Sequence, residues 1–388
     1  MTDFIQPFHF QTPGTMQVEW GGAARLGALL ADMYDERDIL VVTDKFLHEA
    51  GVIDPAKASL AEAGFRVTVF DDVVADPPEE VLERSVVAGR AAGCDIVVGL
   101  GGGSSMDIAK LVAVMMNSDQ ALPAMYGIDN IQGGRVALVQ VPTTAGTGSE
   151  VTNITILTTG ASTKMGVVGR QLFADLVLLD GALTVGLPAI QTAATGIDAM
   201  VHAIEAYTSL NKKNPMSDLL AREALRLLAD NVVAACEDGT NRKAREAMLI
   251  GSNLAGQAFA NSPVAAVHAL AYPLGGHFHV PHGLSNALML GPVLRFNSTA
   301  AAPLYAELAD VVMGQSDADT QTRSTAFVDF MDNLMTRTSA PRRLRDVDVP
   351  ESSLPLLAQD AMKQTRLLQN NPVNVTEEVA LMLYGEAY

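Results

Sequence analysis

The chain has 388 residues, of which 48% are hydrophobic and 18% are charged, and its formal net charge is −18. The composition fits a globular protein with a large buried volume, and the length favours two domains over a single core. Strong negative charge opposes binding to nucleic acid or anionic membrane surfaces, and no apolar run approaches the roughly 20 residues of a membrane helix. We therefore expect neither a nucleic-acid partner nor a membrane partner.

The chain contains two cysteines, Cys94 and Cys236, which lie outside any metal-binding spacing. We interpret both as buried small side chains, as is usual in a reducing compartment. The first residues, MTDFIQPFHFQTPG, lack the basic and apolar regions of a secretory signal. These features predict a cytoplasmic protein.

Up to about residue 180, short β-rich segments alternate with helical segments. Strands are expected at 38–44, 65–70, 95–100, 135–142, 152–159, 164–169 and 174–180. Helices are expected before Gly64, at 79–93 and at 105–116. Several strands are continuously apolar, as in parallel strands that are covered on both faces. The β-α-β-α order predicts a doubly wound parallel sheet in an N-terminal α/β domain, residues 1–183.

After about Leu187 the β signal stops, and apolar residues recur at spacings of three and four. Helices are expected at 218–238, 241–260 and 352–368. The segment DGALTVGLP, residues 180–188, contains the glycines and proline typical of a junction. We therefore predict an all-helical C-terminal domain over residues 184–388.

A glycine-rich turn, in DIVVGLGGGSSMDIAK, joins the strand at 95–100 to the following helix. Glycines let the backbone approach a phosphate closely, and the helix dipole favours an anion near the amides of Ser104 and Ser105. The turn is not the GxGxxG fingerprint, so a tight turn with nothing bound is the alternative interpretation.

Two further features favour a dinucleotide over an empty turn. Asp44 ends the first predicted strand, where a carboxylate can accept hydrogen bonds from a ribose and repels a 2′-phosphate, which favours NAD over NADP. The segment PTTAGTGSE follows the fourth predicted strand, and its three threonines place hydroxyl groups at the carboxyl edge of the sheet. An ordinary polar loop is the alternative for this segment.

The helical half contains a predicted metal site. In GIDAMVHAIEAY, Asp198 and His202 are four residues apart, on one face of a helix. His268 and His282 follow about sixty residues later, and five of the seven histidines of the chain lie in these two regions. One carboxylate and three imidazoles suit a borderline divalent cation such as Fe²⁺ or Zn²⁺. A coordination position left open for substrate would make the site catalytic.

Three neighbouring residues leave alternatives open. His277 and His279 are candidates for supporting groups, proton carriers or plain polar residues, and the last interpretation is favoured for each. Glu205, one turn after His202, fits an acceptor for a ligand imidazole, or a helix charge, better than it fits a metal ligand.

Taken together, these segments resemble the iron-dependent, or group III, alcohol dehydrogenases. The matching segments are GGGSSMDIAK (101–110), PTTAGTGSE (142–150), ATGIDAMVHAIEAY (194–207) and HALAYPLGGHFHVPHG (268–283). The resemblance implies the fold of the dehydroquinate synthase-like superfamily, in which an N-terminal Rossmann-like domain and a C-terminal helical domain hold cofactor and metal between them. It also implies interconversion of a small alcohol with its aldehyde or ketone by an NAD-dependent homodimer or larger homo-oligomer, with Fe²⁺ as the cation and Zn²⁺ as the alternative.

The resemblance assigns roles to individual residues. The metal ligands carry over to Asp198, His202, His268 and His282. The pyrophosphate contacts carry over to Gly101, Gly102, Gly103 and Ser104. Further cofactor contacts carry over to Thr143, Thr144, Thr147 and Lys164, and the ribose-side residue to Asp44.

Two positions depart from the family's pattern. Many members have a second histidine where this chain has Tyr272, and NPV at 371–373 replaces an NPR segment. The proton route out of the site is therefore expected to differ, with Tyr272 and His277 as its candidates. A phenol with its usual pKa near 10 is a poor base unless its pKa is perturbed.

The resulting hypothesis is direct hydride transfer between an alcohol carbon and NAD, with the cation acting as a Lewis acid toward the substrate oxygen. One alternative is a dehydroquinate synthase-like lyase, whose phosphorylated substrate requires basic residues that are not evident beside the predicted ligands. A hydroxyacid–oxoacid transhydrogenase is another alternative on the same fold. A nucleotide-binding protein without catalysis would not require the four ligands.

Overall fold

The computed structural model describes residues 7–160, 163–338 and 340–388 of the protein. Within these residues the chain forms two compact units. An α/β unit is formed by residues 12–144 and 148–186. A helical unit is formed by residues 187–388 together with the short segments 7–11 and 145–147.

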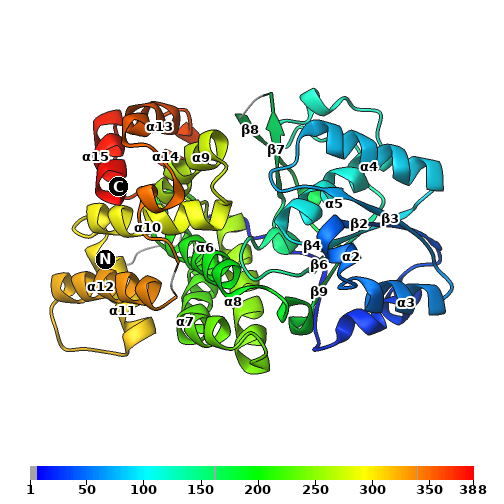
Figure 1. The fold of residues 1–388 in the computed structure, drawn as a ribbon, viewed down its shortest axis with the longest axis horizontal. Coiled ribbons are helices and arrows are strands. Elements are labelled where there is room, and N and C mark those ends of the chain that lie inside the picture. Colours follow the sequence, from blue (N-terminus) through cyan, green and yellow to red (C-terminus); the bar gives the residue numbers. More distant parts are fainter. Residues whose placement is uncertain (1–6, 161–162, 339) are drawn as a thin grey trace. The chain divides into compact units, whose positions relative to one another are not determined.

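A six-stranded, fully parallel sheet forms the centre of the α/β unit (Figure 1), in the order β1-β9-β6-β4-β2-β3. Its strands are β1 Thr15–Val18, β2 Asp38–Asp44, β3 Arg66–Val73, β4 Ile96–Gly101, β6 Ala137–Pro142 and β9 Leu176–Leu179. The predicted doubly wound parallel sheet is thus confirmed. Strand β1 was not predicted, because its sequence TMQV is short and lies mostly exposed at the edge of the sheet.

Helices cover both faces of this sheet, because side chains of both orientations along its strands are apolar. The helices of the unit are α1 Leu26–Met33, α2 Lys45–Glu49, α3 Asp54–Glu62, α4 Glu79–Ala92 and α5 Gly103–Met116. Helices α1 and α3 share a buried cluster with Ile39 and Val41 of β2. The intervening Leu40 points to the opposite face, where it meets Gly89 of α4.

Two of the predicted strands belong to a smaller sheet. Strands β7 Ile154–Thr159 and β8 Thr163–Val168 pair antiparallel, and β5 Gly127–Ile128 adds to β8 in parallel. Their apolar content predicts strands correctly. Only the pairing in the folded chain determines which sheet each strand joins.

The order of the strands reverses between β2 and β4. After β2 the chain places β3 on one side of it, and then returns to place β4 on the other side. The carboxyl ends of β2 and β4 carry Asp44 and Gly101. Open α/β sheets bind ligands at such a reversal, outside the carboxyl ends of the strands.

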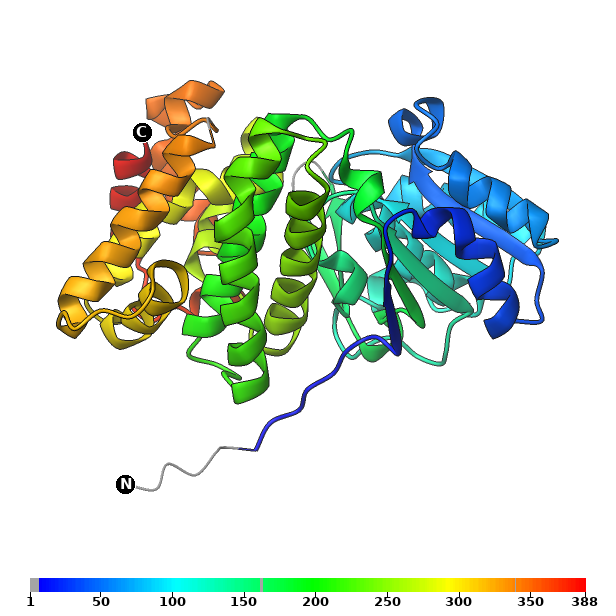
Figure 2. The ribbon, with the colours of Figure 1, turned by 90° about the horizontal axis from the view of Figure 1, so that it is seen from below.

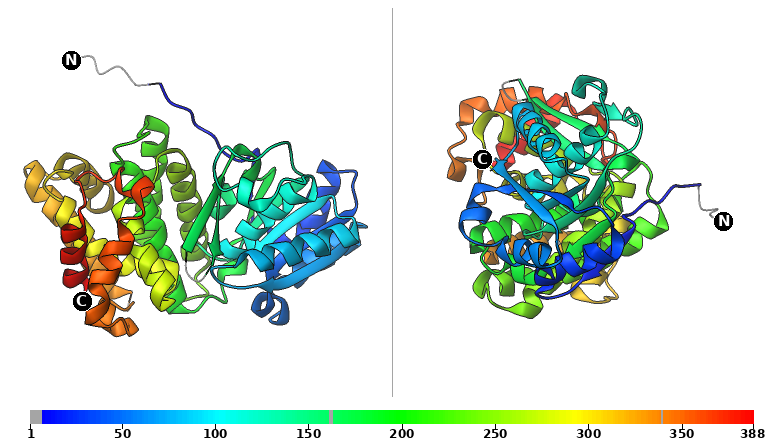
Figure 3. Two further views of the ribbon diagram at one scale, coloured as in Figure 1. Left: turned by 90° about the horizontal axis from the view of Figure 1, so that it is seen from above. Right: turned by 90° about the vertical axis from the view of Figure 1, so that its right-hand side faces the viewer.

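The helical unit contains no strand among its described residues, which confirms the predicted change from an α/β region to a helical one. Its helices are α6 Ala189–Thr208, α7 Pro215–Glu237, α8 Arg242–Asn261, α9 Ala266–Phe278, α10 His282–Asn297, α11 Ala302–Met313, α12 Thr320–Arg337, α13 Leu354–Ala361, α14 Thr365–Leu368 and α15 Glu377–Ala387. Helices α6, α7 and α8 pack on one another (Figure 2). Helices α13 and α15 lie beside α9 and α10 (Figure 3).

The predicted helix at 352–368 is interrupted between α13 and α14. At the interruption the amides of Lys363 and Gln364 bond to carbonyls three residues earlier, which tightens the turn and ends the α-helical ladder. Among the described residues, no helix combines the length and apolar character needed to cross a bilayer.

Candidate functional site

The four predicted metal ligands meet within the helical unit. Asp198 and His202 are on α6, His268 is near the start of α9, and His282 is the first residue of α10. One potential ligand atom from each lies within 4.8 Å of the others. Three of the four are buried, whereas the His282 side chain is 38% exposed, so the cluster is accessible from one side.

A close approach of two helices brings His282 to the cluster. A Cβ atom at Gly283 would lie 2.7 Å from the Ala194 carbonyl oxygen and 3.3 Å from the Asp198 Cβ. Only glycine therefore lets the start of α10 lie this close to α6. The glycine after His282 thus has a packing role that the sequence pattern alone did not reveal.

Hydrogen bonds orient two of the ligand imidazoles. His268 Nδ1 lies 2.7 Å from Glu205 Oε2. The same oxygen accepts from the Ala265 amide, and Glu205 Oε1 accepts from the Val267 amide. His202 Nδ1 lies 3.3 Å from the Gly146 carbonyl oxygen. With the proton on Nδ1 in both rings, each Nε2 has a free lone pair for a cation. Of the two roles that the sequence left open for Glu205, the structure shows that of an acceptor for the His268 imidazole.

The charge states of the cluster also suit a cation. Burial lowers the pKa of His202 to about 3, so this imidazole is neutral at ordinary pH. Burial would raise the pKa of Asp198, but the three imidazoles and a hydrogen bond from Asn286 hold it below its usual value. An ionised carboxylate and a neutral imidazole both bind divalent metals, so the charge states of Asp198 and His202 suit Fe²⁺ or Zn²⁺.

Sequence reasoning missed Asn286, which contacts three of the four clustered residues. Its Nδ2 is 2.6 Å from Asp198 Oδ1 and 3.2 Å from the Nε2 atoms of His268 and His282. Asn286 follows His282 by four residues on α10, so both side chains occupy one face of that helix. This spacing is the signal that could have identified it.

Tyr272 and His277 have different surroundings. The Tyr272 ring is 6.0 Å from the His282 ring, so the phenol lies beside the cluster. His277 Nε2 lies 2.5 Å from the Asp360 carboxylate of α13, which gives this imidazole a partner outside the four ligands. His279 adopts a positive φ of 54° where α9 ends.

Apolar side chains adjoin the ligands. The apolar cluster consists of the buried Val264, Ala269 and Leu367 and the partly buried Phe259, Tyr272 and Leu368. Phe259 stacks on the His202 ring at a centroid distance of 4.3 Å. None of these six side chains carries a charge.

The predicted phosphate-binding turn forms the start of α5 in the α/β unit. Gly102 is the residue before the helix, and no side chain caps the amides of the first turn. A Cβ atom at Gly101 would lie 2.7 Å from Ser105 Oγ, so the tight turn requires glycine there. Gly103 and Ser104 are the first two residues of the helix. The backbone amides at this end can donate hydrogen bonds to an anion.

The other predicted cofactor residues divide between the two units. The Thr143 amide donates to the Gly101 carbonyl, and Thr144 lies near Gly102, so both adjoin the glycine-rich turn. Asp44 caps α2 by accepting from the Leu47 amide at 3.0 Å. Thr147 belongs to the short segment that packs with the helical unit.

Lys164 of β8 forms an ion pair with Asp76 at 2.5 Å, and it donates to the Thr158 hydroxyl at 3.1 Å. Both partners belong to the α/β unit. The predicted contact between Lys164 and a cofactor stays a prediction.

Lys110, a buried lysine to which the sequence assigned no role, holds the end of the threonine-rich segment and the residues that follow it. Lys110 of α5 is fully buried, and its ammonium donates to Ser149 Oγ, Thr152 Oγ1 and the Ile154 carbonyl at 2.7–3.0 Å. It also approaches Asp107 at 3.3 Å. Burial lowers the pKa of Lys110, and the Asp107 charge opposes that effect. The lysine and its partners attach α5 to the segment that follows Gly148.

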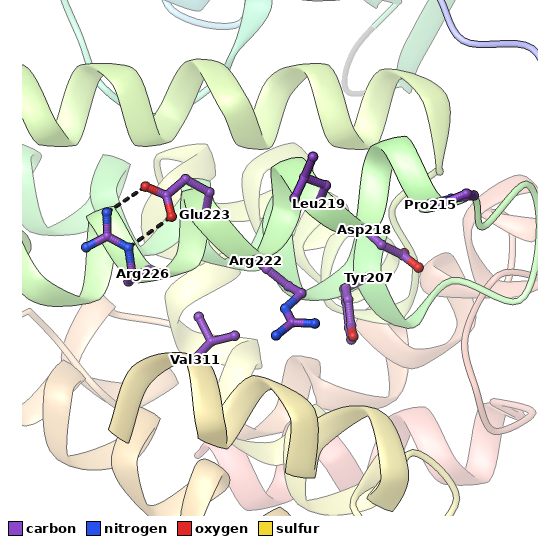
Figure 4. A pocket seen from close by; sticks show the side chains of 8 residues that line it. All are labelled: Tyr207, Pro215, Asp218, Leu219, Arg222, Glu223, Arg226 and Val311. Atoms are coloured by element: carbon purple, nitrogen blue, oxygen red, sulfur yellow. Dashed lines mark hydrogen bonds and ion pairs between the residues drawn. The ribbon is translucent and has the colours of Figure 1, made fainter. Parts of the chain in front are cut away.

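A separate groove of about 620 Å³ lies along α7 of the helical unit. It is lined by Tyr207, Pro215, Asp218, Leu219, Arg222, Glu223, Arg226 and Val311 (Figure 4). None of these is a predicted site residue. Three of its charged side chains form ion pairs, Arg226 with Glu223 and Asp218 with Lys213, both at 2.5 Å.

Comparison with known proteins gives matches over nearly the whole chain. Residues 13–181 match the family described as iron-containing alcohol dehydrogenase, and residues 192–388 match the C-terminal part of the Fe-containing alcohol dehydrogenase family. Long-chain-alcohol dehydrogenase 1 of Geobacillus thermodenitrificans (strain NG80-2) is 38% identical over 97% of this chain and 95% of its own length.

Solved structures match equally broadly. A crystal structure of 1,3-propanediol oxidoreductase has a TM-score of 0.94 and 33% identity, and the match covers 99% of this chain and 100% of that one. A sulfoacetaldehyde reductase from Bifidobacterium kashiwanohense in complex with NAD⁺ has a TM-score of 0.86 and 27% identity, covering 98% of this chain and 99% of that one.

Proposed function

The chain belongs to the iron-containing alcohol dehydrogenase family, and on this premise we propose that it interconverts a small alcohol with its aldehyde or ketone, using NAD and a divalent metal. The observation that carries the proposal is the cluster of Asp198, His202, His268 and His282, in which one carboxylate and three imidazoles converge. We assign Fe²⁺ as the cation, with Zn²⁺ as the alternative. When bound, the cation supplies a Lewis acid that polarises the substrate oxygen.

Residues of the chain hold and orient the reacting groups in this proposal. Glu205 keeps the proton of His268 on Nδ1, so that Nε2 remains a ligand. The exposed side of His282 is the approach for substrate. Tyr272, beside His282, and His277, which is bonded to Asp360, are the candidates for carrying the hydroxyl proton away.

We assign the cofactor contacts to the α5 turn and the threonine-rich segment. The residues are Asp44, Gly101, Gly102, Gly103, Ser104, Thr143, Thr144, Thr147 and Lys164. Support comes from the uncapped amides of α5 and from the reversal of strand order between β2 and β4. We also propose a cytoplasmic location, which the cysteine usage supports. The family resemblance supports a homo-oligomer of at least two subunits.

We further propose that the substrate carries an apolar chain. The rings of Phe259 and Tyr272 lie against His202 and His282, so uncharged aromatic side chains adjoin two of the predicted ligands. The relative named long-chain-alcohol dehydrogenase 1 agrees with this assignment, and the sulfoacetaldehyde reductase is the competing precedent. Among straight-chain primary alcohols, kcat/KM should rise with each methylene by up to about fourfold, the equivalent of about 0.8 kcal/mol. A preference for 2-hydroxyethanesulfonate would contradict this assignment.

His268→Ala tests the metal-dependent mechanism. The variant should bind NAD as the wild-type protein does, but it should lose both bound iron and alcohol-dependent NADH formation, because it lacks one ligand of the cation. Metal content, NAD affinity and the NADH absorbance are the measurements. His9→Ala is the matched control, because His9 is exposed and lies outside both sites. Full turnover by a metal-free His268→Ala protein would refute the mechanism.

A further inference from the structure

The side chain of Asn286 is fully buried, and its two amide atoms are in opposite situations. Nδ2 faces three ligand atoms, of which Asp198 Oδ1 is the nearest at 2.6 Å. Oδ1 is buried and has no hydrogen-bond partner. Buried acceptors without a partner are uncommon in proteins, so the orientation of this amide requires a cause.

The Asp198 carboxylate supplies that cause. If the amide were reversed, its oxygen would face Asp198 Oδ1 at 2.6 Å, and two acceptors would repel each other. A hydrogen bond from an N–H group to an ionised carboxylate is stronger than one between neutral groups. The chain therefore leaves one acceptor unpaired in order to direct the NH₂ group at Asp198.

We propose that Asn286 is a positioning residue of the metal site, whose amide holds the Asp198 carboxylate in the orientation that binds the cation. The NH₂ group has two hydrogens, and the two imidazole contacts at 3.2 Å are longer than the bond to Asp198. When a cation occupies the imidazole lone pairs, the bond to Asp198 is the one that persists. Asn286 thus acts through Asp198 and makes no bond to substrate.

Asn286→Leu tests this inference, because leucine has the same number and branching of side-chain heavy atoms but no donor. In the protein without NAD or alcohol, Co²⁺ affinity is measured by competition with a chelator, and the ligand field is followed by visible absorption. We expect affinity to fall about 10–100-fold, the range for losing a partner of a ligand. When Asp198 is already replaced by alanine, Asn286→Leu should lower Co²⁺ affinity by less than about threefold, because no carboxylate remains for the amide to hold.

The matched control is Asn297→Leu, which also removes a buried amide from α10. Asn297 bonds to Asn371 through both amide atoms at 2.9 Å and does not touch the ligands. The proposal would be overturned if Asn286→Leu left Co²⁺ affinity unchanged, or lowered it no more than Asn297→Leu does. It would also be overturned if Asn286→Leu lowered Co²⁺ affinity equally with Asp198 present and with Asp198→Ala. Circular dichroism checks folding, and if Asn286→Leu does not fold, Asn286→Ala takes its place with the same expected direction, because alanine also lacks a donor.

The inference rests on the proposed metal-dependent function, but the two are tested separately. Failure of the wild-type protein to bind Co²⁺, Zn²⁺ or Fe²⁺ would refute the function. Tight wild-type binding with an unaffected Asn286→Leu variant would refute only the role of Asn286.

Discussion

Asp44 has a structural role that the structure shows and a cofactor-binding role that we propose. It ends β2 and caps α2 with one carboxylate oxygen, which explains an acidic residue there without any cofactor. Its position at the reversal of strand order is also where a ribose binds in doubly wound sheets. The sequence identified the residue, and only the structure added its capping role.

We predict that Asp44→Gly improves the use of NADP relative to NAD, because it removes a charge that repels the 2′-phosphate. Glycine is only a few tenths of a kcal/mol worse than aspartate at the start of a helix. Asp44→Ser is the matched variant, because serine keeps the cap and removes the charge. The ratio of kcat/KM for NADP to kcat/KM for NAD should rise in both variants. An unchanged ratio in both would show that Asp44 does not discriminate between NAD and NADP.

At the scale of elements, the position of α10 against α6 determines whether the ligands meet. Asp198 and His202 are four residues apart on α6, so their proximity is local. His282 begins α10 and reaches them because Gly283 lets that helix start next to the Ala194 carbonyl. The geometry of the cluster therefore depends on this helix contact as well as on the four side chains.

Gly283→Ala should separate α10 from α6 and weaken metal binding although every ligand is retained. Its Cβ would lie 2.7 Å from a backbone oxygen, which cannot rotate away, and such overpacking costs about 1–3 kcal/mol. Gly385→Ala on α15 is the control, because no atom lies within 4 Å of the added Cβ. The measurements are the free energy of unfolding and Co²⁺ affinity. A Gly283→Ala protein with normal metal affinity would contradict this account of the contact.

At the scale of the whole molecule, the four ligands belong to one of the two compact units. All are on α6, α9 and α10 of the helical unit, whereas the α5 turn belongs to the α/β unit. A ligand stabilises the structure that binds it, by about 2.7 kcal/mol at one hundred times its dissociation constant. The metal should therefore act chiefly on the stability of the helical unit.

The single tryptophan, Trp20, lies in the α/β unit and reports its unfolding by fluorescence, while circular dichroism reports mainly on the helices. Removing the metal should lower the midpoint of the circular-dichroism transition more than that of the fluorescence transition. NAD should raise the fluorescence midpoint. Equal shifts of both signals would mean that the two units unfold as one cooperative body.

Local periodicity was enough to predict the change of class from α/β to helical near residue 187, because apolar runs and helical spacing are properties of neighbouring residues. It failed for β1, whose four mostly exposed residues become a strand only by pairing with β9. It also failed to separate β7 and β8 from the main sheet, since strand pairing depends on distant partners.

The sequence by itself determined the fold class, the pair of candidate ligands on α6 and the glycine-rich turn, because each depends on residues close together in the chain. Only the tertiary structure decided that His268 and His282 meet that pair, that Asn286 faces Asp198 and that Lys110 fixes the segment after Gly148. Those contacts join residues that are about 40 to 90 positions apart. Their geometry follows from helix packing, which no local pattern encodes.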